Sequence, residues 1–187
     1  MKFCFLFLFI NFFQLTFSQI YKCPISDGQI INGYKNNEVQ QRYKATFLKD
    51  NPNISPVDLT VITNNENAEI RSVVKGIVSY IGNDSDYIAI IYDKNKMIVY
   101  DLIEKITLKK GDIVEIGTVV GKVKLNNFMP KNYKKILDYT GLIYSVNLSF
   151  YAIDDKTGNL IHFPKFAEII NCKTIICEKC QPIIHGM

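Results

Sequence analysis

The chain has 187 residues, of which 48% are apolar, 21% charged and 12% aromatic. This composition is typical of one globular domain and excludes a disordered or collagen-like chain. The formal net charge is +4, from 22 basic and 18 acidic side chains. Only Arg42 and Arg71 are arginines, and a lysine-rich, nearly balanced charge does not indicate nucleic-acid binding.

The N-terminal segment 1–18 has the layout of a secretory signal peptide. A lysine follows the initial methionine, an apolar run covers 3–13, and a polar stretch ends on the small residue Ser18. The apolar run is shorter than the about 20 residues that a membrane span needs. We therefore predict cleavage after Ser18, a periplasmic or secreted protein, and no membrane span after cleavage. An uncleaved anchor and a lipid-modified Cys23 are the alternatives.

Further along the chain, short β-branched and apolar runs alternate with turn residues, which is typical of an antiparallel β domain. Two short helices are predicted at 36–47 and 130–141, and the second begins at Pro130 and ends before Gly141. The fold class is therefore all-β, with one or two short helices and a C-terminal tail that contains cysteines. The predicted strands are 57–63, 68–80, 87–92, 97–102, 106–108, 114–116, 119–123, 144–153 and 160–163.

Four cysteines remain after the predicted cleavage, an even number in an oxidising compartment. They are Cys23, Cys172, Cys177 and Cys180. Structural disulfides are the first interpretation, and the sequence leaves the pairing open. The Cys-x-x-Cys at 177–180 also allows a zinc site completed by His185, a redox pair or free thiols.

One stretch of the chain carries a resemblance to a known family. The segment 109–121 (KKGDIVEIGTVVG) joins a Gly-Asp turn to two later glycines that allow β layers to approach closely. With VVKGIV at 73–78, IVY at 98–100 and NLSF at 147–150, this order resembles the lysostaphin-like (LytM-type) zinc endopeptidases over about 54–166. The resemblance implies a β-sheet domain of the barrel-sandwich hybrid type. Lipoyl and biotinyl carrier domains share the turn pattern, but no modifiable Asp-Lys-Ala or Met-Lys-Met is present.

The family's zinc chemistry is missing from the matching positions. The family holds zinc with a His-x-x-x-Asp pair and the second His of a His-x-His, and these ligands fall on Ile54, Asp58 and Ser149. The first His of the His-x-His falls on Asn147, and that of Tyr-x-His-Leu falls on Leu102. One carboxylate and one alcohol do not make a zinc site. The resemblance therefore implies that zinc is lost, that there is no catalytic residue, and that no cofactor is bound.

The remaining histidines are interpreted as structural. His162 is expected on an edge strand and His185 in the tail, and neither is expected to be a ligand. The former active-site groove is expected to survive as a neutral binding cleft in which Asp58 hydrogen-bonds to Asn147 or Ser149. The candidate groove residues are Asp58, Tyr100, Leu102, Asn147 and Ser149.

These observations predict a signal peptide at 1–18, an N-terminal extension at 19–53, the peptidase-type β domain at 54–166 and a tail at 167–187. The predicted function is that of an exported pseudoenzyme, a binding or regulatory module of the cell envelope. Its partner would be peptidoglycan or a cell-wall hydrolase. The alternatives are an active peptidoglycan endopeptidase with unconventional ligands and a purely structural envelope protein.

Overall fold

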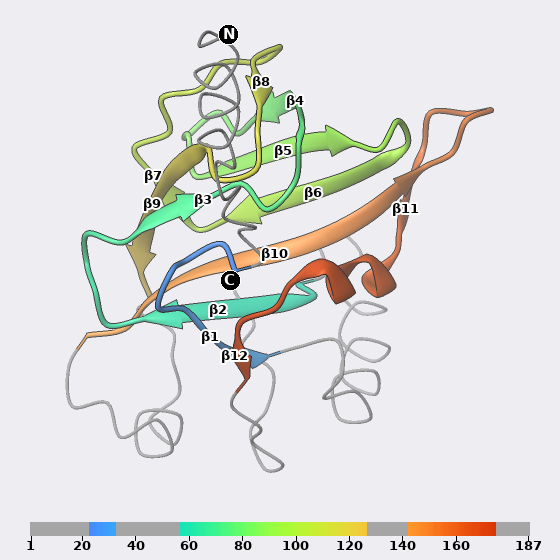
Figure 1. The fold of residues 1–187 in the computed structure, drawn as a ribbon. Helices are drawn as coiled ribbons and strands as arrows, with labels where there is room; N and C mark the ends of the chain where they lie inside the picture. The colour runs from blue at the N-terminus through green and yellow to red at the C-terminus, as the bar shows by residue number, and fades with distance from the viewer. Residues whose placement is uncertain (1–22, 33–56, 127–141, 175–187) are drawn as a thin grey trace, which may run out of the picture.

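In a computed structural model, residues 23–32, 57–126 and 142–174 are described, and they form twelve strands and one short helix (Figure 1). The elements are β1 (Gln29–Asn32), β2 (Leu59–Thr63), β3 (Glu69–Arg71), β4 (Gly76–Ile81), β5 (Tyr87–Tyr92), β6 (Lys96–Asp101), β7 (Ile103–Glu104), β8 (Ile113–Val114), β9 (Val119–Leu125), β10 (Tyr144–Ile153), β11 (Leu160–His162), the 3-10 helix η1 (Pro164–Ile169) and β12 (Lys173–Thr174).

Most strands belong to one long sheet. Its order is β12-β1-β2-β10-β6-β5-β4-β8, and β11 pairs with β10 beyond the end of β2. The β1–β12 pair is parallel, and the other pairs among the described strands are antiparallel. The predicted antiparallel all-β class is confirmed.

A small sheet of β3, β7 and β9 packs on the inner face of the long sheet (Figure 1). Ile70 of β3, Ile103 of β7 and Val120 of β9 share one apolar cluster with Ile98 and Tyr100 of β6. Burial of these large side chains away from water is the main contribution to the stability of the fold. The core lies on this inner face, so the outer face of the long sheet is left to form a site.

The predicted strand 68–80 is two strands, because the chain bends between them. The Ser72 N–H donates to Thr118 O at 2.8 Å, and the Ser72 hydroxyl donates to Val74 O at 2.6 Å. β3 therefore joins the small sheet and β4 the long one. β4 begins at Gly76, where a Cβ atom would lie 2.3 Å from Ile91 O, so the close approach of β4 and β5 requires glycine.

Two other strand predictions were also wrong. The segment 106–108 is not a strand, because the backbone turns at Leu102 and Lys105, which both have positive φ (60° and 55°). The short strand β7 lies between these two turns instead. The strands β1 and β12 were not predicted, although they lie in the segments assigned to the N-terminal extension and the tail. The predicted helices at 36–47 and 130–141 lie outside the described residues.

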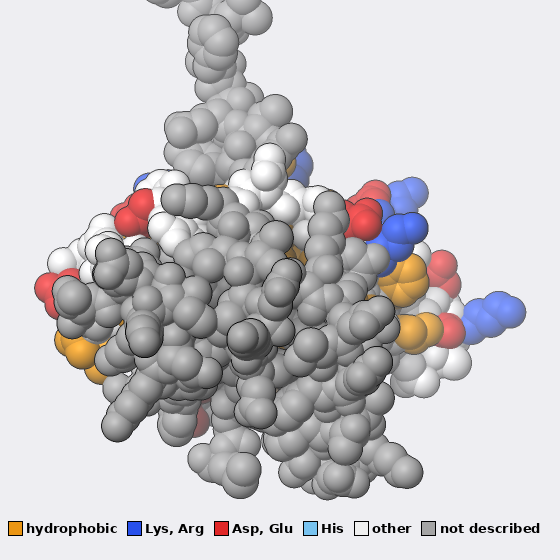
Figure 2. All heavy atoms as spheres, turned by 90° about the horizontal axis from the view of Figure 1, so that it is seen from below, with side chains coloured by type: hydrophobic (Ala, Val, Ile, Leu, Met, Phe, Trp, Pro, Cys, Tyr) orange, Lys and Arg blue, Asp and Glu red, His pale blue; other side chains and the backbone are white. Residues whose placement is uncertain are grey.

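The described surface has no large region of one charge in the view of Figure 2, where acidic and basic side chains lie beside one another at its rim. This agrees with the nearly balanced composition. In the described ranges, no helix has the length and apolar character that crossing a membrane requires.

Candidate functional site

The outer face of the long sheet carries rows of side chains that run across the strands. Residues directly opposite each other in an antiparallel pair project to the same face. One row contains Tyr80, Ala89, Val99 and Ser149, from β4, β5, β6 and β10. The neighbouring row contains Tyr87, Asp101, Asn147 and Thr60, from β5, β6, β10 and β2.

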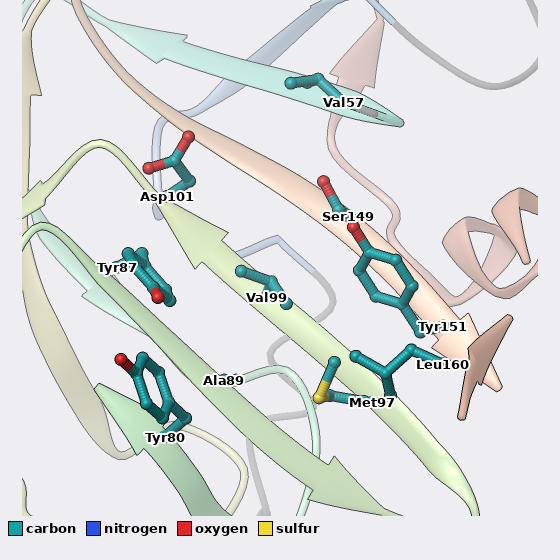
Figure 3. Close-up of a pocket in the computed structure, with 10 residues that line it drawn as sticks. All are labelled: Val57, Tyr80, Tyr87, Ala89, Met97, Val99, Asp101, Ser149, Tyr151 and Leu160. Atoms are coloured by element: carbon teal, nitrogen blue, oxygen red, sulfur yellow. The ribbon is translucent and has the colours of Figure 1, made fainter. Parts of the chain in front are cut away.

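These rows form the floor of a groove of about 660 Å³ (Figure 3). Its lining is mostly apolar and aromatic, and among the described residues that line it only Asp101 carries a charge at neutral pH. The Tyr80 and Tyr87 rings stack with their centroids 5.6 Å apart. The lining residues are Val57, Tyr80, Tyr87, Ala89, Met97, Val99, Asp101, Ser149, Tyr151 and Leu160.

Asp101 is a partly buried carboxylate in this groove. Its Oδ1 accepts a hydrogen bond of 2.8 Å from the Leu102 N–H. Burial raises the pKa of Asp101, and the nearby negative charge of Asp86 raises it further. The Leu102 N–H and the more distant Lys124 oppose this rise in pKa. No lysine or arginine of the described ranges forms an ion pair with Asp101.

Asp58 lies beside the groove, at a junction of three strands. Along one edge of β10, β2 pairs with 144–148 and β11 with 151–153. Phe150 lies in the gap between them, and its N–H donates to Asp58 Oδ2 at 2.9 Å. The Asp58 N–H in turn donates to Leu148 O at 2.9 Å. The fully buried carboxylate thus satisfies a backbone donor that no strand partner reaches.

His162 approaches the same carboxylate from β11. Its Nε2 lies 2.9 Å from Asp58 Oδ1 and 3.1 Å from Oδ2. The register of β10 and β11 places His162 opposite Tyr151, with ring centroids 5.8 Å apart. The His162 side chain is 28% exposed, whereas that of Asp58 is fully buried. The expectation that no cationic group faces Asp58 is therefore corrected, because His162 fills that place.

Asn147 is fully buried in the same row as Asp101. The Thr60 hydroxyl donates to its Oδ1 at 2.9 Å. Its Nδ2 has no hydrogen-bond partner within the part of the chain that the structure describes. A buried donor without a partner is rare in folded proteins and is costly.

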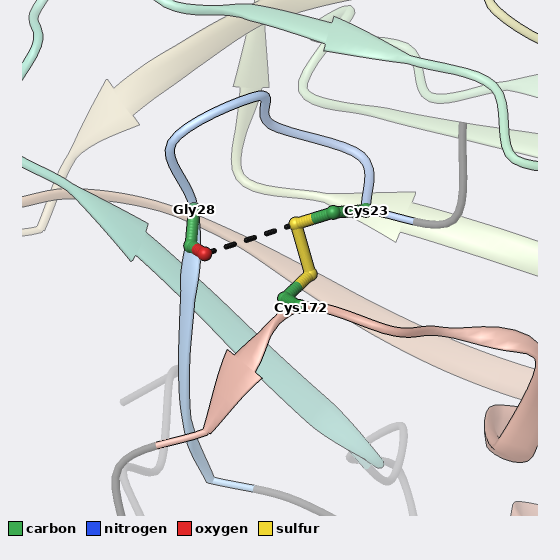
Figure 4. The surroundings of a disulfide bond; sticks show 3 residues. All are labelled: Cys23, Gly28 and Cys172. Atoms are coloured by element: carbon green, nitrogen blue, oxygen red, sulfur yellow. Dashed lines mark hydrogen bonds between the residues drawn. A yellow bond between two sulfur atoms is a disulfide. The ribbon is translucent and has the colours of Figure 1, made fainter. Parts of the chain in front are cut away.

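A disulfide joins the two ends of the described chain (Figure 4). It links Cys23, ahead of β1, to Cys172, ahead of β12, and Cys23 Sγ lies 3.8 Å from Gly28 O. The bond lies close to the parallel β1–β12 pair and closes a sequence separation of 149 residues. Of the four candidate cysteines, these two are paired, and Cys177 and Cys180 lie outside the described residues.

Comparison with solved structures identifies the architecture. A putative glycyl-glycine endopeptidase LytM from Ruminococcus gnavus superposes with a TM-score of 0.53 at 14% identity, over 82% of this chain and 63% of that one. The chain has the lysostaphin-like peptidase fold. Lysostaphin from Staphylococcus simulans (TM-score 0.42, 14% identity, 59% of this chain and 42% of that one) is also similar. So is the catalytic domain of the prophage-encoded protein EnpA from Enterococcus faecalis (0.41, 18%, 61% and 82%). No protein-family model and no curated protein matches the sequence.

The lysostaphin-like fold implies zinc, but the described residues do not fit this metal. No three His, Cys, Asp or Glu side chains gather into a candidate metal site within the described ranges. At the matching ligand positions, both Asp58 oxygens bind His162, and Oδ2 also binds the Phe150 N–H. Ser149 offers only an alcohol, and Ile54 lies outside the described residues. A tetrahedral catalytic zinc needs three protein ligands and an open position.

The structure brings Asp58, Asn147 and Ser149 together at adjacent positions of β2 and β10. Tyr100 does not belong to this group. It lies on the inner face, where its fully buried hydroxyl accepts a hydrogen bond of 3.0 Å from the Val73 N–H. Leu102 lies at the bend between β6 and β7 and does not line the groove.

Sequence reasoning missed His162, Tyr80 and Tyr87 as site residues. His162 lies 104 positions from Asp58, so no local motif joins the two. The hairpin register of β10 and β11 was the one usable signal, because it places His162 opposite Tyr151. Tyr80 follows a register shift in β4, which the alternation of apolar residues does not reveal.

Proposed function

We propose that this protein is an exported, non-catalytic protein that binds the peptide part of cell-wall peptidoglycan in the groove of its outer sheet face. One observation carries the proposal. The Asp58 carboxylate, at the position of a family zinc ligand, is bonded to His162 and the Phe150 N–H, while a groove of about 660 Å³ lies beside it.

The groove is suited to binding an extended peptide. It contains aromatic rings, apolar floor residues and a few polar groups, a combination common in ligand sites. Tyr80 and Leu160 are large and about half exposed (44% and 52%), so a ligand would cover apolar surface that water now contacts. Proteins that share the fold include a putative glycyl-glycine endopeptidase, which supports a peptide ligand.

Export is part of the proposal. The Cys23–Cys172 disulfide supports it, because disulfides persist mainly in oxidising compartments such as the periplasm and the cell exterior. The predicted signal peptide points to the same location.

Co-sedimentation with purified peptidoglycan tests the proposal. Wild-type protein is expected to sediment with the wall material, and Tyr80→Ala is expected to weaken binding about tenfold through lost aromatic contact. Ile113→Ala is the matched control, because Ile113 is 72% exposed on β8 of the same sheet but does not line the groove. Equal binding by both variants and the wild type would overturn the proposal.

A turbidity assay on the same wall material, with added zinc, tests the absence of catalysis. The proposal expects no clearing. Zinc-dependent clearing would instead establish an active endopeptidase with unconventional ligands. A protein that neither binds nor clears the wall would be an envelope protein of structural function.

A further inference from the structure

Within the proposed binding function, we propose that the groove selects ligands with a positively charged amino group, which binds the Asp101 carboxylate beside the Tyr80–Tyr87 stack. The inference names the chemical class of the ligand and rests on the groove being the binding site. A lysine or other diamino-acid side chain in a peptide, or a free peptide N-terminus, presents such a group.

Charge complementarity is the first reason. Asp101 is the one charged side chain among the described residues that line the groove, and it is partly buried. Of its oxygens, Oδ1 accepts from the Leu102 N–H, and no lysine or arginine of the described ranges forms an ion pair with it. A partly desolvated carboxylate is stabilised by a cation that also donates hydrogen bonds.

The aromatic walls favour the same ligand. Tyr87 lies directly opposite Asp101 on the neighbouring strand, and Tyr80 stacks on Tyr87 (Figure 3). Faces of aromatic rings attract ammonium groups, more strongly where water is partly excluded. An anionic ligand such as a nucleic acid or a phosphate would be repelled by Asp101, with Asp86 adding to the negative potential nearby.

The other polar neighbour of Asp101 complements a peptide. Asn147 lies opposite Asp101 on β10, and its Nδ2 is a buried donor without a partner among the described residues. A carboxylate that accepts and an amide that donates, side by side in one row, match an amino group and a carbonyl oxygen of one ligand. This orphaned donor is an observation independent of the charge of Asp101.

The test compares purified peptidoglycan with its free amines intact and the same material after acetylation with acetic anhydride, which removes the positive charge. The variant is Asp101→Asn, in which the side-chain oxygen can still accept from the Leu102 N–H. Asp155→Asn, in the exposed β10–β11 turn, is the control with the same change of charge. Thermal unfolding checks that each variant is folded, and light scattering gives its oligomeric state.

We expect acetylation to weaken wild-type binding about tenfold, and Asp101→Asn to weaken binding to untreated material by a similar factor. Acetylation should then change the binding of Asp101→Asn little, because both changes remove one interaction. Asp155→Asn should behave as the wild type. If Asp101→Asn proves unstable, the wild-type comparison of the two wall preparations still decides.

Unchanged wild-type binding after acetylation would overturn the amine inference. If Tyr80→Ala still weakens binding in that case, the groove remains the binding site and only the ligand class is wrong. If neither variant weakens binding, the proposed function fails as well. A change of oligomeric state in Asp101→Asn or Tyr80→Ala, with wall binding unchanged, would make a second copy of the chain the occupant and would also overturn the inference.

Discussion

Replacing Asp58 by alanine should destabilise the protein by about 3 kcal/mol, because the carboxylate joins three strands. The substitution leaves the Phe150 N–H without its acceptor in a buried gap, and an unsatisfied buried donor costs about 1–3 kcal/mol. It also removes the bond from His162 Nε2, and a hydrogen bond to a charged group contributes about 1.5–3 kcal/mol. Relief of the buried carboxylate's desolvation offsets part of this sum.

Two further variants separate the contributions. Asp58→Asn keeps an oxygen that can accept from the Phe150 N–H, so we expect a loss of about 1 kcal/mol. His162→Ala keeps the Phe150 bond and removes a side chain that is already 28% exposed, so its loss should be about 1–2 kcal/mol. Asp155→Ala, an exposed aspartate in the β10–β11 turn, is the control and should stay within about 0.5 kcal/mol.

The measurement is urea unfolding followed by far-UV circular dichroism, because the chain contains no tryptophan. A double-mutant cycle of Asp58→Asn and His162→Ala gives the coupling between the two side chains. A loss below about 1 kcal/mol for Asp58→Ala would refute the reasoning that the carboxylate holds the junction. A larger loss for His162→Ala than for Asp58→Ala would refute the assignment of the backbone donor to Asp58.

Three other predictions concern the disulfide, Asp101 and the packing of the small sheet. Cys172→Ser should cost about 4–5 kcal/mol by the chain-entropy model, because the Cys23 bridge closes 149 residues; equal urea midpoints with and without reductant in the wild type would contradict it. Burial raises the pKa of Asp101, so stability present below about pH 4 is lost as pH rises through the raised pKa. Asp101→Asn should therefore melt above the wild type at pH 7 and beside it at pH 3.5, and the reverse order would show the sign to be wrong. Gly121→Ala would place a Cβ 2.2 Å from Ile103 Cγ2 and should cost about 1–3 kcal/mol, with part regained in the double variant with Ile103→Ala.

The sequence by itself predicted the strands whose pattern is local. The hairpin of β5 and β6 follows from two apolar runs around a four-residue polar turn, and it was found within about one residue of its predicted bounds. The long strand β10 was predicted with its observed bounds. Turn chemistry and alternation act over a few residues, so these elements need no knowledge of distant partners.

The resemblance also located the site correctly at β2 and β10, since Asp58, Asn147 and Ser149 lie together. It did not predict which side of the sheet each residue faces after a bend. Tyr100 projects into the core and Leu102 turns with positive φ, because the chain leaves the long sheet there to enter the small one.

Only the tertiary structure decided what surrounds Asp58. Its carboxylate bonds to Phe150 and His162, which lie 92 and 104 residues away in sequence. The gap that it fills exists because β2 and β11 share one edge of β10 without meeting. Pairings of this kind depend on how strands from distant parts of the chain align, and the free energy that selects them comes from burial and hydrogen bonding in the assembled sheet, which no local pattern of residues encodes.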